Sequence, residues 1–334
     1  ITIVMRNLKK KKGKLRLKKF NISLIISAMS YSSLYSLKYK ERIVGKHDDE
    51  VLGVFVNEAD TRVATCSLDE TIKIWSIPEG KELVTMRGHL GQVNNLSFSG
   101  NDKWIASASG DHTVRVWDVV TGEQLKIFKG HTDQVIGVYF SQDDSSTFIA
   151  STSFDKTVKL WDFRLGTEIK TLRDHSEPTN NVAYSYDGKY IASCSDDKSI
   201  KIWSTDLESK EPVMTLLGHD APVLTVLYSF DSKKLASSDQ DGVIKIWSMP
   251  DGKLLNTWKA HDELVQDISF AEDNTTLVSA SLDKKVKLWN SDNSKLLWEH
   301  DAGVEIWSVD LVYDATTIVI GCVDGTVRYL EKQK

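Results

Sequence analysis

Histidine and aspartate, residue types used in metal binding and general acid–base chemistry, recur along this chain at a nearly constant spacing. Seven of the eight histidines are each followed, 22 or 24 residues later, by an aspartate. The histidines are His47, His89, His131, His175, His219, His261 and His300, and the aspartates are Asp69, Asp111, Asp155, Asp197, Asp241, Asp283 and Asp324. A catalytic or metal site would break such a repeat at one place. The spacing therefore indicates a structural role.

The other reactive residue types form no catalytic or metal-binding motif. The three cysteines, Cys66, Cys194 and Cys322, form no C-x-x-C pair, and no two histidines have the H-x-x-x-H spacing of a zinc site. The sequence contains no G-x-S-x-G, H-E-x-x-H, G-x-x-x-x-G-K-[ST] or G-x-G-x-x-G. We therefore expect no catalytic residue, no metal and no cofactor. Three unpaired cysteines are typical of a reducing compartment.

The elements that carry these residues must repeat with them. Six residues after each of the first six aspartates stands a tryptophan, and Leu330 takes that place in the seventh unit. The tryptophans are Trp75, Trp117, Trp161, Trp203, Trp247 and Trp289. Each unit holds four short runs of alternating apolar and polar residues between turn residues, a pattern typical of β-strands. Seven such units predict an all-β fold, a single seven-bladed β-propeller with four-stranded antiparallel blades.

On these residues the chain resembles the WD-repeat family. The resemblance covers roughly residues 34–330 and includes G-H pairs, as at Gly88-His89, and W-D pairs, as at Trp161-Asp162. The glycine of the G-H pair is replaced in four units, at Lys46, Asp174, Ala260 and Glu299. These departures weaken single repeats and leave the predicted fold unchanged.

The resemblance also implies a hydrogen-bonded chain inside each blade. In the family, the aspartate accepts from the histidine ring, the histidine bonds a Ser or Thr hydroxyl on the second strand, and the hydroxyl accepts from the tryptophan indole. The hydroxyl candidates are Thr65, Ser107, Ser151, Ser193, Ser237 and Ser279. Ile320 stands at this position in the seventh unit, so we expect an incomplete network there.

The two ends of the repeat region are expected to close the ring. The last unit stops after its third strand, and residues 34–44 align with a fourth strand, so an N-terminal strand would complete the last blade and remove exposed sheet edges. Residues 1–28 match no blade. We expect a propeller of residues 29–334, preceded by a disordered tail or an upstream extension outside the native protein. The alternative is a nuclear-import or nucleic-acid patch at Lys9–Lys12.

The tail and the propeller have opposite net charges, and the charge of the propeller limits the classes of partner that it can bind. Residues 1–28 carry nine Lys or Arg and no acidic residue, which leaves a net charge of −14 on residues 29–334. An acidic propeller repels nucleic acid and favours basic protein segments. No apolar run approaches the 18 residues of a membrane span. We expect a cytoplasmic or nuclear protein, monomeric within a hetero-complex, that acts as a non-catalytic scaffold for proteins or peptides. A propeller enzyme is the alternative from another functional class.

One local match suggests a more specific function. Trp161-Asp162-Phe163-Arg164 reads W-D-x-R and resembles the box by which some WD-repeat proteins dock on the adaptor of cullin-type ubiquitin ligases. The resemblance implies that Arg164 would make this contact through its guanidinium. Arg also follows W-D-x in ordinary blades, so the match leaves both interpretations open.

The resemblance places the partner-binding residues around one mouth of the channel. Loop lengths vary least where the histidines and aspartates lie, so we expect that face to be the rigid platform. In the family two positions per blade ring this mouth, five residues after the histidine and directly before the aspartate. The candidates are Leu52, Leu68, Asn94, Ile136, Phe154, Asn180, Leu224, Gln266, Leu282 and Glu305. Their apolar members predict a patch suited to a basic peptide with an apolar anchor, unless neighbouring side chains cover them.

Overall fold

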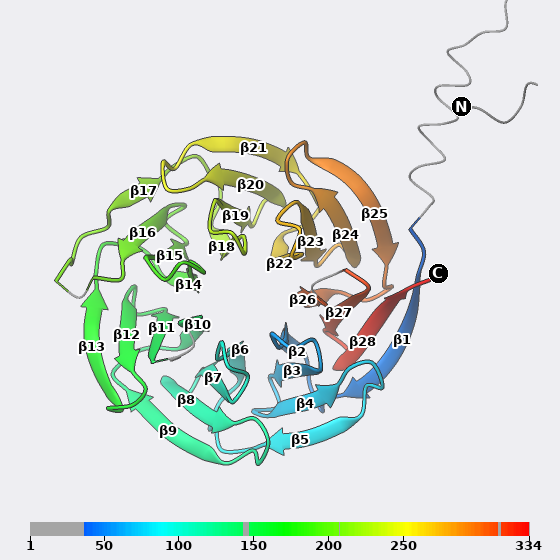
Figure 1. Cartoon of the computed structure of the whole chain (residues 1–334), viewed down its shortest axis with the longest axis horizontal. Helices are drawn as coiled ribbons and strands as arrows, with labels where there is room; N and C mark the ends of the chain where they lie inside the picture. Colours follow the sequence, from blue (N-terminus) through cyan, green and yellow to red (C-terminus); the bar gives the residue numbers. More distant parts are fainter. Residues whose placement is uncertain (1–36, 143–146, 207, 313–314, 334) are drawn as a thin grey trace, which may run out of the picture. The chain divides into compact units, whose positions relative to one another are not determined.

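The computed structural model describes residues 37–142, 147–206, 208–312 and 315–333. These residues form seven four-stranded antiparallel sheets arranged as blades around a central channel, and they contain no helix (Figure 1). The predicted all-β propeller is therefore confirmed. Within the same residues, nothing helical is long and apolar enough to cross a membrane.

In the first six blades the strands follow one another from the channel outward in sequence order, whereas in the last blade the outermost strand is β1. The innermost strands are β2 (Val51–Val56), β6 (Val93–Phe98), β10 (Val135–Phe140), β14 (Thr179–Tyr184), β18 (Val223–Tyr228), β22 (Val265–Phe270) and β26 (Ile306–Leu311). The second strands are β3 (Arg62–Ser67), β7 (Trp104–Ser109), β11 (Phe148–Ser153), β15 (Tyr190–Ser195), β19 (Lys234–Asp239), β23 (Thr276–Ser281) and β27 (Thr317–Cys322).

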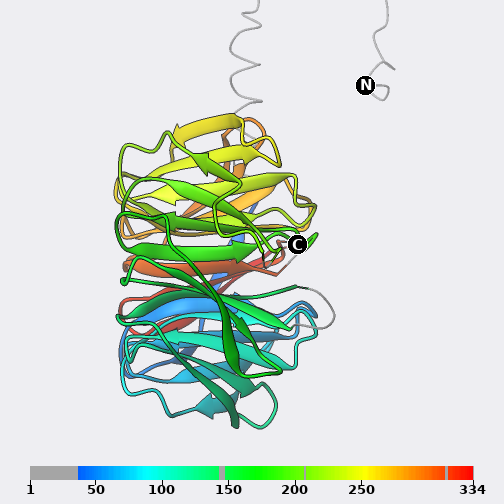
Figure 2. The same cartoon turned by 90° about the vertical axis from the view of Figure 1, so that its left-hand side faces the viewer.

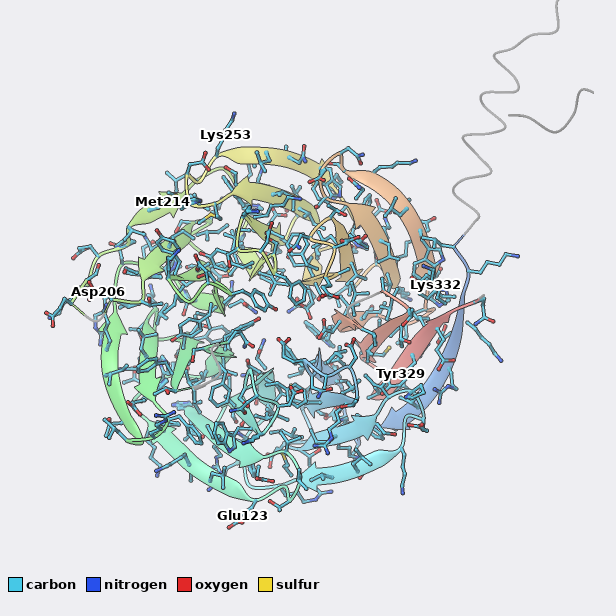
Figure 3. All side chains as sticks on the ribbon, viewed as in Figure 1. Glu123, Asp206, Met214, Lys253, Tyr329 and Lys332 are labelled. Atoms are coloured by element: carbon cyan, nitrogen blue, oxygen red, sulfur yellow. The ribbon has the colours of Figure 1, made fainter. Side chains whose placement is uncertain are left out.

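The two outer strands of each blade complete the ring. The third strands are β4 (Ile72–Ser76), β8 (Thr113–Asp118), β12 (Val158–Asp162), β16 (Ile200–Ser204), β20 (Val243–Ser248), β24 (Lys285–Asn290) and β28 (Thr326–Lys332). The outermost strands are β5 (Glu82–Met86), β9 (Gln124–Lys129), β13 (Thr167–Leu172), β17 (Met214–Leu216), β21 (Leu254–Lys259), β25 (Lys295–Asp301) and, in the last blade, β1 (Tyr39–Lys46). In Figure 3 the labelled Lys253 side chain points away from this outer edge.

Strand β1 closes the ring, as the sequence predicts. It pairs antiparallel with β28, from Tyr39 opposite Lys332 to Lys46 opposite Thr326, and the two strands lie side by side in Figure 1. The strand extends two residues beyond the predicted end at 44. Residues 34–36, the tail of residues 1–28 and the Lys9–Lys12 patch lie outside the described residues, so those predictions remain open.

The hydrophobic core lies between neighbouring blades. In one cluster, Val114 and Phe128 of the second blade pack against Val138, Phe140 and Trp161 of the third. The regular spacing of Trp therefore places one large ring at six of the seven junctions, and Leu330 lies at the junction of blades six and seven. Burying a tryptophan removes about 150–250 Å² from water, a gross gain of about 4–6 kcal/mol before entropy is deducted.

The loops gather at the two ends of the strands, as the side view shows (Figure 2). One face carries the fourth-to-first strand loops and the second-to-third strand turns. In six blades a backbone hydrogen bond joins these two segments. The residue before the turn aspartate donates its N–H to the carbonyl of the residue that precedes the first strand, as Leu68 does to Glu50 and Val323 to Glu305. We call this the histidine face, because the histidines and turn aspartates of the first six blades lie on it.

Candidate interaction surface at the channel mouth

The hydrogen-bonded chain within each blade is present in blades one to six. The histidine Nδ1 lies 2.6–2.9 Å from a carboxylate oxygen, and Nε2 lies 2.7–2.9 Å from the hydroxyl oxygen on the second strand. The tryptophan Nε1 donates to that hydroxyl at 2.8–2.9 Å. The histidine, carboxylate, hydroxyl and indole groups hydrogen-bond to one another, and these bonds hold each turn against its blade.

The surroundings of these pairs favour a carboxylate beside a neutral imidazole. Burial would raise the pKa of Asp69 and Asp111, but hydrogen bonds from the histidine and from the threonine two residues later hold the pKa of both carboxyls well below the usual range. Burial also lowers the pKa of His89 and His131. A neutral ring with its proton on Nδ1 can donate to the aspartate and accept at Nε2.

Blade five uses a different aspartate from the predicted one. His219 Nδ1 lies 2.6 Å from Asp239 Oδ2, whereas Asp241 is exposed and makes no such bond. Asp239 stands where the other blades have the serine that ends the second strand, as Ser67 does in blade one. Its carboxylate also accepts from the backbone N–H groups of Asp241 and Val243, so it replaces the turn aspartate as well. The prediction for Asp241 is therefore wrong.

Blade seven departs further, and the predictions for His300 and Asp324 as a pair are wrong. His300 lies on the outermost strand of blade six, where its Nε2 is 2.7 Å from Glu41 Oε2 of the closing strand. Asp324 instead accepts from Arg328, whose guanidinium also donates to Glu41 and to the Ala302 carbonyl. Ala302 is four residues before the first strand's start, the place that the histidine occupies in the other blades. An arginine thus substitutes for the missing ring.

Seven β-bulges set the side chains around the channel mouth. In every blade the pairing of the first and second strands shifts register at one residue, next to the start of the first strand. A bulge leaves that residue unpaired and re-aims its side chain. The bulge residues are Leu52, Asn94, Ile136, Asn180, Leu224, Gln266 and Trp307. All seven line one cavity of about 100 Å³ at the mouth.

This arrangement supports six of the expected mouth positions and replaces the seventh. The register shift in blade seven lies between Ile306 and Ser308, so the bulge residue is Trp307 and not the predicted Glu305. Trp307 donates its indole N–H to Glu50 at 2.6 Å, whereas Glu305 is exposed outside the cavity. Counting from the misplaced His300 produced the error of two residues.

The turn-tip residues expected at the mouth are partly covered. Phe154 is 40% exposed, whereas Leu68 and Leu282 are intermediate. A further exposed apolar residue was missed: Leu90, directly after His89, is 84% exposed on the same face. Most other blades have a small or acidic polar residue after the histidine, so this break in the pattern was the signal available in the sequence.

The loops of the histidine face are strongly acidic. The exposed carboxylates Asp48, Asp49, Glu70, Asp133, Asp220, Asp241, Asp262, Glu263 and Glu305 take part in none of the ion pairs formed within the described parts of the chain. The same loops carry five basic residues, Arg87, Arg173, Lys156, Lys198 and Lys284. The carboxylates outnumber the basic residues of these loops, so the electrostatic potential at the mouth is negative.

Two carboxylates lie in the channel below the mouth. Burial raises the pKa of Asp267 to about 7 and that of Asp310 to about 6, although each accepts a serine hydroxyl and backbone N–H groups. Ser308 donates to Asp267 at 2.6 Å, and Ser269 donates to Asp310 at 2.7 Å, so the hydroxyls link blades six and seven. No group of three or more His, Cys, Asp or Glu that could hold a metal ion occurs among the residues placed by the structure.

Comparison with known protein families agrees with the repeat architecture. The family model described as "WD domain, G-beta repeat" matches residues 39–76, 80–118, 122–162, 166–204, 210–248 and 252–290. The chain belongs to the WD-repeat family. Each matched WD repeat begins at, or a few residues before, the outermost strand of one blade and ends on the third strand of the next. None of the curated proteins compared with the chain matches it.

The seventh blade keeps the WD-repeat backbone with most of its characteristic side chains replaced. Its strands β26, β27 and β28 lie outside the six matched repeats, yet with β1, which lies inside the first, they form the same four-stranded sheet. Ala302, Ile320 and Leu330 replace the His, Ser and Trp of the other blades, and burial of Ile320 and Leu330 substitutes apolar packing for hydrogen bonds. WD-repeat propellers are commonly protein-interaction scaffolds.

Proposed function

We propose that this chain is a non-catalytic scaffold that binds protein or peptide partners on the histidine face, as a subunit of a multiprotein complex. The observation that carries the proposal is the cavity ringed by the seven bulge residues, with apolar side chains at Leu52, Ile136, Leu224 and Trp307. Rigid strands hold this ring, and unpaired carboxylates surround it. Apolar anchors within a polar rim are typical of protein interfaces.

A paired affinity purification with mass spectrometry tests this function. The full chain is compared with a variant carrying Ile136→Glu and Phe154→Glu, which place two charges at the mouth. The matched control is Val120→Glu, because Val120 is 67% exposed on the loop between β8 and β9, at the opposite face. Thermal melting checks that all three fold. We expect the double variant to lose a defined partner set that the control keeps; identical partner sets would refute the proposed platform.

A second candidate function rests on Arg164. Arg164 is exposed on the same β12–β13 loop and forms no hydrogen bond or ion pair with the rest of the described chain. A free guanidinium beside exposed Leu165 is suited to docking on a ubiquitin-ligase adaptor. Arg164→Ala should then release the adaptor while Arg173→Ala, another exposed arginine, does not. Retention of the adaptor by both variants, or its absence from the wild-type purification, excludes this function.

A further inference from the structure

The cavity at the channel mouth has the size of a side-chain terminus. Its volume is about 100 Å³. A cavity of roughly 150 Å³ takes a benzene ring, so this one holds about four heavy atoms, close to the number in a guanidinium group or the end of a lysine. A folded domain cannot enter such a space, but one side chain of a partner polypeptide can.

The floor of this cavity contains one carboxylate without a counter-charge. Asp267 lines the cavity, and no ion pair found in the described residues includes it. It accepts from the Ile268 N–H at 2.9 Å, from the Ser308 hydroxyl at 2.6 Å and from the Val309 N–H at 3.2 Å. These neutral donors orient the carboxylate and do not neutralise it. A buried carboxylate whose hydrogen-bond donors are all neutral keeps its negative charge uncompensated, so a cation that reaches it binds favourably.

The walls add hydrogen-bond acceptors and apolar surface. Asn94 donates its amide N–H to the Val135 carbonyl at 2.8 Å, and Asn180 donates to the Val223 carbonyl at 2.9 Å. These bonds engage the amide nitrogens and leave the Oδ1 atoms available to accept. Ammonium and guanidinium groups are donors only, so they match such acceptors. Leu224 and Trp307 at the rim provide contact for the methylene stem of a long cationic side chain.

We propose that the mouth cavity binds the cationic side chain, lysine or arginine, of a partner polypeptide, with Asp267 as its counter-charge. The acidic loops of the histidine face would concentrate the basic partner, and the cavity would select one of its charged side chains. The inference rests on the proposed interaction function and specifies the chemistry of that partner.

The same geometry makes recognition depend on pH. Among the titratable groups nearby, Asp310 on β26 raises the pKa of Asp267, and Asp267 in turn raises the pKa of the buried Cys66 thiol on β3. Burial, the largest cause, raises the pKa of Asp267 to about 7. A cation favours the ionised carboxylate, so binding releases a proton and tightens as pH rises. Between pH 6 and pH 8 the affinity for a cationic side chain should increase by up to about tenfold.

Fluorescence polarisation with the full chain tests this inference. The probes are three labelled peptides, GSKLXLKSG, in which X is lysine, arginine or uncharged norleucine; the flanking lysines face the acidic loops in all three. We expect lysine or arginine at X to bind at least about tenfold more tightly than norleucine at pH 8. Asp267→Asn should reduce this preference to less than about twofold and leave the norleucine peptide unchanged. Asp310→Asn is the control and should keep the preference at pH 8, because Asp310 does not line the mouth cavity and its removal only favours the ionised form of Asp267.

A result that contradicts the cation site can be told apart from a failure of the proposed scaffold function. Equal binding of all three peptides, or a preference that survives in Asp267→Asn, overturns the cation site while the purification experiment still decides the platform. No binding of either cationic peptide also overturns it. The pH dependence of the wild-type chain needs no variant, so a preference that does not rise between pH 6 and pH 8 refutes the role of Asp267 even if Asp267→Asn fails to fold.

Discussion

His219 and Asp239 are joined by a 2.6 Å contact between Nδ1 and Oδ2, although the turn position of their blade belongs to Asp241. Asp239 is 2% exposed, and Asp241 is exposed. A buried carboxylate that accepts hydrogen bonds from a histidine and from two turn N–H groups contributes more to the free energy of unfolding than an exposed carboxylate does. The two aspartates, two residues apart, therefore offer a matched pair of variants.

We expect Asp239→Ala to lower the free energy of unfolding by about 1–3 kcal/mol, because it leaves the buried Nδ1 of His219 without a partner. Asp241→Ala should change it by less than about 0.5 kcal/mol, as surface substitutions usually do. Urea denaturation measures both. Equal losses in the two variants would mean that Asp241 shares the structural role.

The closing strand depends on a charged cluster that can be tested in the same way. Glu41 accepts from Arg328, which is buried, and from His300. We expect Glu41→Ala to destabilise the propeller by about 1–3 kcal/mol, since the guanidinium loses its acceptor. Lys40→Ala, at the neighbouring exposed position, is the control and should be nearly neutral. The opposite order of effects would show that the cluster contributes nothing to closure.

The turn after Asp239 contains a glycine that has no room for a side chain. Gly242 has a φ of +77°, and a Cβ there would lie 2.4 Å from the His261 carbonyl oxygen and 2.5 Å from that of Glu263. Gly188 has a φ of +71°, but a Cβ would meet nothing within 4 Å. Gly188→Ala should cost about 1 kcal/mol for the left-handed backbone, and Gly242→Ala should cost clearly more because backbone atoms must move. Thermal melting of both variants gives the comparison; similar shifts would mean that the turn relaxes freely.

The channel carboxylates predict how stability depends on pH. Asp267 has a pKa of about 7 in the folded protein, against an ordinary value of about 3.9. The stability that this group contributes is therefore present below about pH 4 and is lost as pH rises through 7. Asp267→Asn removes the titration, so it should raise the free energy of unfolding by about 2–3 kcal/mol more at pH 8 than at pH 5.

Urea denaturation at both pH values measures this difference. Any constant cost of the amide, such as a lost hydrogen bond from Ile268, cancels between the two conditions. A variant whose gain is no larger at pH 8 than at pH 5 would indicate that Asp267 is ionised across this range.

The fold could be predicted from the residues that repeat in each blade, and the wrong site predictions fall where that repeat is interrupted. Six Trp, six correctly placed His and the alternating strands predicted the seven blades and their closure. In blade seven the interval from Trp289 to His300 is 11 residues, and His300 was taken for a repeat histidine although Ala302 holds that place. The first-strand pattern beginning at Ile306 was the better reference, and it points to Trp307.

The channel residues were harder to predict for a physical reason. Whether Asp267 and Asp310 face solvent, a neighbour or the channel depends on how seven blades meet, and no spacing within one blade contains that information. The pKa of each carboxyl follows from this burial. Likewise, Asp239 could be distinguished from Asp241 only when the chain is folded, since both lie within reach of the turn in sequence.

The pairing of β1 with β28 has a consequence during synthesis on the ribosome. Lys46 and its partner Thr326 are separated by 280 residues, a stretch that takes roughly 15–60 s to translate at typical elongation rates. Throughout that interval β1 exists without the strand that completes its sheet, while the intervening blades can fold one after another. The last blade can form only after the final strand emerges, so a stalled nascent chain would present unpaired strand edges to its neighbours.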